Sequence, residues 1–427
     1  MMAFLFLLWG VVNVILVYNV FRPLQWSNNG LFIFSTFVLG WLIGDLVFHW
    51  IVFNLGVVLL FYFSGALDNI VGQTALILMT ASCFALAVRI EQLFRLPSLV
   101  QQQMNVALGI GYEEQILSQF RQNFTPSRFD WKVYWNPTSL LKNPNIDIIR
   151  NIVFHENDDF CLKLDIYRPK QHTGACPVLL QIHGGAWTIG TKIQGIPLMT
   201  RMAAQGWACF AITYRLSPKA IFPDHVIDCK QAICWIKENG TQYGADPNFI
   251  ILTGGSAGGH LAALTALTPN HEEFQPGFES ADTAVQGCVA FYGIYDFAAP
   301  FKDRMQKPLA KLLEIVTDST PENNPQLYCK ASPTQQIFEN PPPFMIIQGE
   351  ADALVSIGEA RKFYQLLQEA NTHHLTFLQL PLVEHGFDTL PTLTTQSVLP
   401  AVEQYLSLLR TEYVSQHAKA GTYPAHD

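Results

Sequence analysis

The sequence predicts an α/β fold built on a mostly parallel sheet that is covered on both faces, preceded by an α-helical transmembrane region. Apolar strand-like runs alternate with helix-period segments between residues 148 and 413. The later runs are apolar at almost every position, which is typical of parallel strands buried on both faces. Only 14% of the 427 residues are charged, and almost all of these lie downstream of residue 88. The chain therefore divides into a membrane part and a water-exposed part.

Residues 1–95 are predicted to form a transmembrane region of three or four spans, because apolar segments cover residues 1–21, 31–63 and 70–90. The first segment has no basic stretch before it and no small-residue cleavage site, so it is interpreted as an anchor rather than a signal peptide. The middle segment would reach about 50 Å as one helix, against a hydrocarbon core of ~30 Å. It is therefore either one long span or two helices.

Asp45 and His49 are the polar pair within the middle segment, and on a continuous helix they would share one face. One hypothesis makes them a polar intramembrane site for a lipid headgroup or a proton. The other, which we favour, makes them an interhelical hydrogen-bond pair or marks an interfacial break near Gly44.

The distribution of basic residues predicts the side of the membrane. With three spans, Arg22 lies on the same side as Arg89 and Arg95, while the loop with Asp68 has no lysine or arginine. The positive-inside rule then places the domain of residues 148–413 in the cytoplasm. With four spans the domain would lie on the same side as the N-terminus. The scattered downstream cysteines fit reduced core thiols.

Three further segments flank or interrupt the main domain. Residues 96–147 are apolar and rich in aromatic residues, and we expect them to lie along the bilayer surface or to form part of a cap. Residues 297–343 interrupt the strand and helix pattern with polar turns that contain proline, which predicts a cap insertion or a long surface excursion. Residues 414–427 are expected to form a tail.

A Gly-X-Ser-X-Gly turn with Ser256 at its centre follows the apolar run of residues 249–253 and precedes a helix-like segment. Strand, sharp turn and helix in this order are typical of a nucleophile elbow, in which flanking glycines let the strand and helix pack closely. The sequence therefore predicts Ser256 as a catalytic nucleophile.

A second motif supports the same chemistry upstream. The apolar run of residues 177–182 leads into His183, Gly184 and Gly185. Acyl transfer needs backbone N–H groups preset for an oxyanion, typically from such a loop and from the residue after the nucleophile. Gly184, Gly185 and Ala257 are the predicted donors.

A serine nucleophile needs a base and a carboxylate that orients the base, in the chain order serine, acid, histidine. Asp352 lies in a Gly-X-X-Asp turn after the apolar run of residues 344–348, so it is the leading acid; Glu350 and Asp388 are its competitors. His385 follows the next apolar run and is the predicted base.

The other histidines are assigned to structure rather than to chemistry. His183 is expected to shape the oxyanion loop, His260 to pack or hydrogen-bond, and His373 and His374 to be solvated or at an edge. His-Glu-X-X-His and Cys-X-X-Cys motifs are absent from the sequence, so no metal and no organic cofactor is predicted. The net charge of −8 and the lack of a basic cluster argue against a nucleic-acid partner.

Taken together, these motifs resemble the hormone-sensitive-lipase and carboxylesterase branch of the α/β-hydrolases. Within it, the chain is most similar to membrane-linked bacterial lipases or esterases such as those of mycobacteria. The resemblance implies an α/β-hydrolase fold, carboxylic-ester hydrolysis through a Ser-Asp-His triad, and a mobile cap. One departure is Ala186 and Trp187, where many members carry a third glycine. The resemblance covers roughly residues 148–412 through these motifs: residues 183–185, 214–218, 244–248, 254–261, 291–297 and 385–387.

The expected function is that of a membrane-anchored serine esterase or lipase, with the bilayer and a lipophilic ester as its partners. The same site would also serve a lipid acyltransferase or an amide or thioester hydrolase, because triad and oxyanion donors are common to all of them. A non-catalytic membrane scaffold is the alternative from another class.

Overall fold

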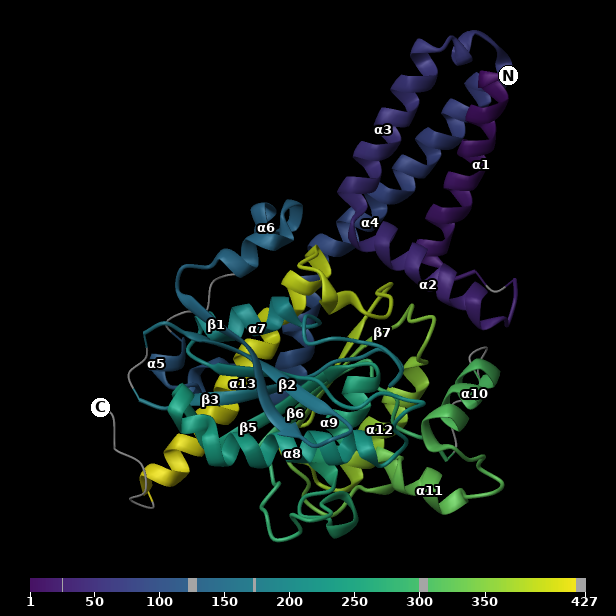
Figure 1. Cartoon of the computed structure of the whole chain (residues 1–427). Helices are drawn as coiled ribbons and strands as arrows, with labels where there is room; N and C mark the ends of the chain where they lie inside the picture. The colour runs from purple at the N-terminus through teal and green to yellow at the C-terminus, as the bar shows by residue number, and fades with distance from the viewer. Residues whose placement is uncertain (25, 122–128, 172–173, 299–305, 420–427) are drawn as a thin grey trace.

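The computed structural model describes residues 1–24, 26–121, 129–171, 174–298 and 306–419. A narrow helical bundle projects from a larger domain that is built around a sheet (Figure 1). Helices α1, α3 and the first part of α4 run side by side in the bundle, and α2 lies across its base, next to the larger domain. The α-helices are α1 Met2–Phe21, α2 Gly30–Asp45, α3 Val47–Phe63, α4 Ile70–Leu108, α5 Ser118–Arg121, α6 Trp131–Trp135, α7 Ile196–Ala204, α8 Asp224–Asn239, α9 Ala257–Leu267, α10 Gln306–Thr317, α11 Pro325–Lys330, α12 Ile357–Glu369 and α13 Leu393–Lys419.

The sheet has eight strands in the order β1-β2-β4-β3-β5-β6-β7-β8. Strands β1, β2 and β4 pair antiparallel, and all pairs from β4 to β8 are parallel, which confirms the predicted mostly parallel sheet. We did not predict β1, because two register shifts against β2 break the simple alternation of its side chains. The strands are β1 Ile146–Glu156, β2 Cys161–Pro169, β3 Cys176–Ile182, β4 Ala208–Ile212, β5 Ala245–Gly255, β6 Gly287–Phe291, β7 Phe344–Gly349 and β8 Thr376–Leu380.

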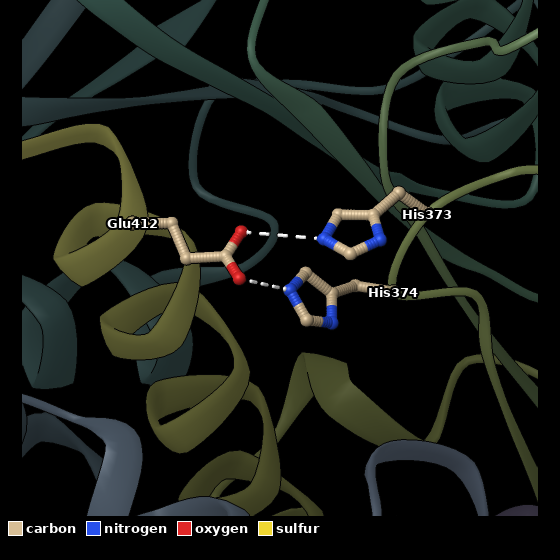
Figure 2. A group of neighbouring side chains, drawn as sticks. All are labelled: His373, His374 and Glu412. Carbon is tan, nitrogen blue, oxygen red and sulfur yellow. Dashed lines mark hydrogen bonds and ion pairs between the residues drawn. The ribbon is translucent and has the colours of Figure 1, made fainter. Parts of the chain in front are cut away.

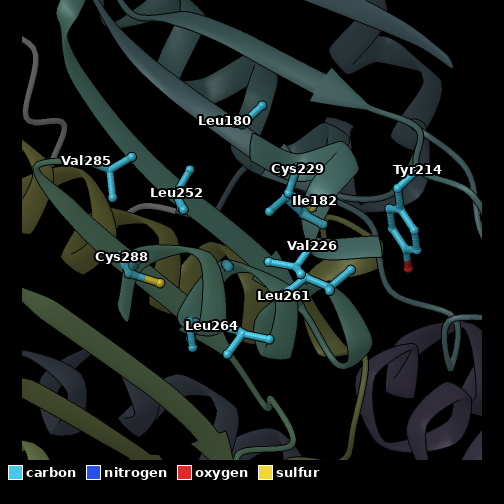
Figure 3. Close-up of a cluster of buried hydrophobic side chains, with 14 of the residues drawn as sticks. Leu180, Ile182, Tyr214, Val226, Cys229, Leu252, Leu261, Leu264, Val285 and Cys288 are labelled. Carbon is cyan, nitrogen blue, oxygen red and sulfur yellow. The ribbon is translucent and has the colours of Figure 1, made fainter. Parts of the chain in front are cut away.

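Helices cover both faces of the sheet, and each face has its own apolar core. Helices α8, α9 and α12 pack on one face, where Leu180, Leu252, Val226 and Leu261 meet (Figure 3). Helices α7 and α13 and the end of α4 pack on the other. Alternate residues of each central strand face opposite cores, which explains the nearly continuous apolar runs in the sequence.

Helix α4 joins the bundle to the sheet without a break. Its 39 residues run through the domain boundary that we expected at residues 95 and 96, so that boundary falls inside one helix. Gln103 on α4 hydrogen-bonds the edge strand β8 in both directions, from its Nε2 to Gln379 O at 2.9 Å and from Gln379 N to its Oε1 at 2.7 Å. The end of α4 therefore covers the sheet edge, which would otherwise expose unpaired backbone groups.

The middle apolar segment forms two helices, as one of our two interpretations allowed. Helices α2 and α3 meet at Leu46 with a bend of 91°. Helices α1 and α4 are each long and apolar enough to cross a membrane, and the bent pair would supply a third crossing if counted as one span. The break next to Gly44 agrees with the structural hypothesis for the Asp45 region.

Asp45 does not pair with His49. Its Oδ1 lies 3.6 Å from Arg89 Nη2 of α4 and accepts a 2.6 Å hydrogen bond from Thr394 Oγ1 at the start of α13. The His49 ring instead lies against Trp135 at a tilt of 46°, with ring centroids 4.1 Å apart. Asp45 therefore ties the helix bend to the segment that follows His385.

Replacing Arg89 with methionine should lower the thermal unfolding temperature of the detergent-solubilised protein. The substitution leaves the buried Asp45 carboxylate without its cation, and breaking a buried pair in this way typically costs about 3–5 kcal/mol in the free energy of unfolding. Adding Asp45→Asn in the same chain should recover part of the loss, because the uncompensated charge is then gone. Equal unfolding temperatures for the single variant and the parent would contradict this prediction.

The flanking segments also take definite positions. Helix α6 packs against the helix bend, and Tyr134 OH donates to Asp45 O at 3.3 Å. The described part of the expected cap insertion contains α10 and α11, and α10 lies beside the start of α2, where a Cβ built on Gly30 would be 3.5 Å from Pro308 Cβ. Residues 299–305 of that insertion lie outside the described residues. Helix α13 continues to Lys419, past the tail boundary expected at residue 414, and residues 420–427 are not described.

Candidate active site

Ser256 sits at the sharp turn between β5 and α9, with φ +58° and ψ −122°. This backbone conformation is strained for a residue with a side chain. A Cβ built on Gly258 would lie 2.1 Å from Ile182 O, so this position has room only for glycine. Close packing of strand and helix thus fixes Ser256 at the C-terminal end of β5, in the conformation of a nucleophile elbow.

The loop after β3 lies directly against this turn. A Cβ built on Gly184 would be 3.3 Å from Ser256 Cβ. Gly184 N–H donates to Gln194 Oε1 at 2.7 Å, so this predicted oxyanion donor is already engaged. Among the described residues, the N–H groups of Gly185 and Ala257 have no hydrogen-bond partner; the latter is the first amide of α9. Two of the three predicted donors are therefore open.

His385 and Asp352 are paired at the ends of neighbouring strands. His385 Nδ1 lies 2.7 Å from Asp352 Oδ2. The N–H groups of Leu354 and Val355 both donate to Asp352 Oδ1 at 2.8 Å, and Gln348 Nε2 donates to Oδ2 at 2.8 Å. An ionised carboxylate only accepts hydrogen bonds, so this contact assigns the proton to Nδ1 and leaves Nε2 as an acceptor.

The two competing acids lie elsewhere. Asp388 accepts a hydrogen bond from Tyr292 OH, and its burial raises its pKa above the ordinary range. The Glu350 side chain is 42% exposed and its carboxylate is 3.9 Å from Arg361 Nη2. The geometry thus pairs His385 with Asp352, the acid that the sequence ranked first.

Ser256 Oγ has no hydrogen-bond partner among the described residues, so the structure does not join it directly to His385. Tyr292 lies between the elbow and the histidine. A Cβ built on Gly255 would be 2.7 Å from Tyr292 OH, and the Tyr292 and His385 ring centroids are 4.4 Å apart. Catalytic hydrogen bonds are often longer before substrate binds and tighten in the complex.

Two residues at this site were missed from the sequence. Tyr292 directly follows β6 with φ +37°, and its position at a strand end was the available signal. Phe37, on α2, lies edge-on to His385 with ring centroids 5.8 Å apart. On the same helix, a Cβ built on Gly40 would be 3.6 Å from Glu384 Cγ. No motif in the sequence connects an apolar N-terminal helix with a residue almost 350 positions away.

Two other histidines near the elbow are buried and neutral. Burial lowers the pKa of His183 to about 4, and its Nδ1 lies 2.8 Å from Gly184 O. Burial likewise lowers the pKa of His260 to about 4; this residue hydrogen-bonds Ala331 O and the Trp187 indole. Both roles match the structural assignments made from the sequence.

One side-chain group departs from the expectation of no metal-binding cluster. The donor atoms of His373, His374 and Glu412 all lie within 4.8 Å of one another. Sequence motifs did not reveal it, because Glu412 comes from α13 and the histidines from the loop before β8.

A family model described as BD-FAE matches residues 164–367, which include Ser256 and Asp352 and stop before His385. The matched residues make up a little less than half of the chain, so the chain is similar to this family over the central part of the sheet-containing domain. The resemblance to mycobacterial esterases is also confirmed. The chain is 46% identical over 266 residues to the probable carboxylic ester hydrolase LipM of Mycobacterium tuberculosis (61% of each chain), and 43% identical over 250 residues to esterase LipQ of the same organism (58% of this chain and 59% of that protein).

A more distant relative is the plant isoprenylcysteine α-carbonyl methylesterase ICME of Arabidopsis thaliana, which is 28% identical over 238 residues, or 52% of this chain and 55% of that protein. The chain spans about three fifths of the length of the curated relatives that it matches. In each case the matched length is close to that of the sheet-containing domain alone.

Solved structures of esterases share the fold. A truncated carbohydrate esterase from gut microbiota aligns with a TM-score of 0.52 at 25% identity, covering 62% of this chain and 96% of that one. The butyrate-bound esterase Est2 of Thermogutta terrifontis aligns with a TM-score of 0.51 at 23% identity, covering 66% and 97%. The sheet-containing domain thus has the α/β-hydrolase type of esterase fold.

Proposed function

We propose that this protein is a membrane-anchored serine carboxylic-ester hydrolase that acts on lipophilic esters. The observation that carries the proposal is the Asp352–His385 pair at the same end of the sheet as the strained Ser256 turn. The names of the mycobacterial relatives support an ester as the scissile bond.

The proposed mechanism uses only side chains and backbone groups of this chain. Ser256 Oγ attacks the ester carbonyl while His385 Nε2 accepts its proton, and Asp352 stabilises the imidazolium that forms. Gly185 and Ala257 N–H groups stabilise the oxyanion; Gly184 would join them only if Gln194 moved away. His385 then protonates the leaving alcohol, and water activated by the same histidine releases the acyl group.

The membrane part of the proposal rests on α1, α4 and the bent pair of α2 and α3. If these are three crossings, with α3 as the crossing part of the bent pair, Arg22, Arg89 and Arg95 lie on the side of the sheet-containing domain, which the positive-inside rule assigns to the cytoplasm. Helix α2 then lies across the base of the bundle, as Figure 1 shows, with Phe37 facing His385. Helix α2 also exposes apolar residues: Leu31, Phe34 and Leu39. A lipophilic ester could therefore move from the bilayer to Ser256 along this helix.

The plant relatives agree with a lipophilic substrate. The name of ICME describes the methyl ester of an isoprenylated cysteine, which combines a small alcohol with a long apolar group. We propose the same general class here, an ester with one extended apolar part, without assigning that compound to this protein.

Hydrolysis of p-nitrophenyl esters from two to sixteen carbons by the detergent-solubilised full-length protein tests the proposal. We expect a preference for medium or long acyl chains. Product analysis with and without a competing long-chain alcohol separates hydrolysis from transfer, because a transferase would form the new ester. If the protein is folded and yet consumes no ester in any of these reactions, the enzymatic assignment is wrong.

Phe37→Ala should reduce kcat/KM for the long-chain esters by about tenfold, the effect expected when one apolar contact to a substrate chain is lost. Phe84→Ala is the matched control, since Phe84 is an exposed phenylalanine of the helical bundle that lies on α4 and is 75% exposed. Equal losses in both variants would show that Phe37 acts only through general membrane contact.

A further inference from the structure

The His373, His374 and Glu412 side chains form a compact group at the opposite end of the sheet from Ser256. His374 Nε2 lies 2.6 Å from Glu412 Oε1, and His373 Nε2 lies 3.5 Å from Glu412 Oε2. Both imidazoles point their Nε2 atoms at one carboxylate (Figure 2). The group thus presents two nitrogen donors and one oxygen donor to a common point.

The backbone brings the two neighbouring rings to the same side. In an extended strand, consecutive side chains point to opposite faces. Here His374 has φ +49°, in the left-handed region that residues other than glycine rarely adopt, and the ring centroids are 3.8 Å apart. A backbone outlier that places polar side chains together supports a functional hypothesis.

We propose that His373, His374 and Glu412 bind a divalent transition-metal ion of the zinc class, with water completing the coordination. Two histidines and one carboxylate form a known ligand set for such ions. Ligand atoms about 2.0–2.1 Å from a tetrahedral ion lie about 3.3 Å apart. One ligand atom from each of the three residues already lies within 4.8 Å of the other two, so small side-chain movements would bring them to that spacing.

The surroundings allow an ion to reach the group from solvent. A groove of about 930 Å³ between α4, α12 and β8 is lined in part by both histidines, and the His373 side chain is 70% exposed.

A bound ion would link two segments that are distant in sequence. The histidines precede β8, whose other end leads to His385, and Glu412 lies in the last part of α13. Tyr405 OH of α13 also donates to His374 O at 2.9 Å, so the two segments are already in contact. The site lies at the far end of β8 from the Asp352–His385 pair, so the ion would not take part in the reaction. It would instead stabilise the fold by joining the loop before β8 to α13.

Isothermal titration with zinc chloride tests the site on full-length protein that is free of a polyhistidine tag and treated with a chelator. Because Cys161 and Cys329 are exposed and thiolates bind zinc, the parent for the titration carries Cys161→Ser and Cys329→Ser. We expect saturable binding at one ion per chain and a rise in unfolding temperature with zinc. His374→Ala and Glu412→Gln should each weaken binding at least tenfold.

Two controls make the result decisive. His155→Ala removes a histidine outside the group and should leave binding unchanged. His373→Ala removes the most exposed ligand, so it keeps the test valid if the other variants are unstable. Absence of saturable binding to the parent, or binding that survives His373→Ala and Glu412→Gln, would overturn the proposal and leave a simple His–Glu ion pair.

Discussion

Replacing Ser256 with alanine is expected to reduce kcat for ester hydrolysis by about 10⁴- to 10⁶-fold, with little change in unfolding temperature. The nucleophile is lost, but the turn that holds it depends on the glycine contacts around it rather than on the hydroxyl group. Hydrolysis of a p-nitrophenyl ester measures the rate, and a fluorophosphonate probe measures labelling of the serine.

The control is Ser118→Ala, which removes an exposed serine hydroxyl from the short helix α5. This variant should keep both hydrolysis and labelling. If Ser256→Ala retains hydrolysis, the nucleophile has been misassigned; if the parent is labelled but releases no acid, the acyl group goes to another acceptor.

Asp352→Asn should lower kcat by about 10⁴-fold, which is the effect of holding the histidine in the wrong tautomer. The asparagine would fill the same space, and its amide oxygen could still accept from Leu354 and Val355. Its amide nitrogen would then face His385 Nδ1, so Nδ1 would act as acceptor and Nε2 would carry the proton. A base in that form cannot accept a proton from Ser256.

Glu350→Gln is the matched control for this prediction, because Glu350 is two residues away and half-exposed. We expect its pH–rate profile and kcat to equal those of the parent. A large loss in Glu350→Gln with normal activity in Asp352→Asn would reverse the order of the two acids.

The local parts of the site were predictable because each rests on a short-range rule. A glycine-bounded serine after an apolar strand predicts the Ser256 turn, and the order of strand ends predicts Asp352 and His385. The parallel sheet followed from continuous apolar runs in the same way.

Contacts between distant segments were not predictable. The pairing of Asp45 with Arg89 and Thr394 depends on a bend that brings α2 onto the loops after β8. The sequence presented His49 as the nearer partner, since it is on the same predicted helix face. Likewise, the side chain of Gln194, ten residues further along the chain, accepts the hydrogen bond of the Gly184 N–H group and so occupies this oxyanion donor. No strand or turn pattern in the sequence shows this contact.

The unbroken course of α4 would hold the sheet-containing domain close to the bilayer in the membrane-anchored hydrolase that we propose. Its 39 residues span about 58 Å, of which a bilayer core would take up ~30 Å. The remaining part of α4 hydrogen-bonds β8 through Gln103, so a continuous helix rather than a flexible linker joins the sheet to the bundle. If α4 crosses the membrane as proposed, turnover should follow the mole fraction of ester in the protein's own leaflet, and an ester confined to a facing vesicle should be out of reach.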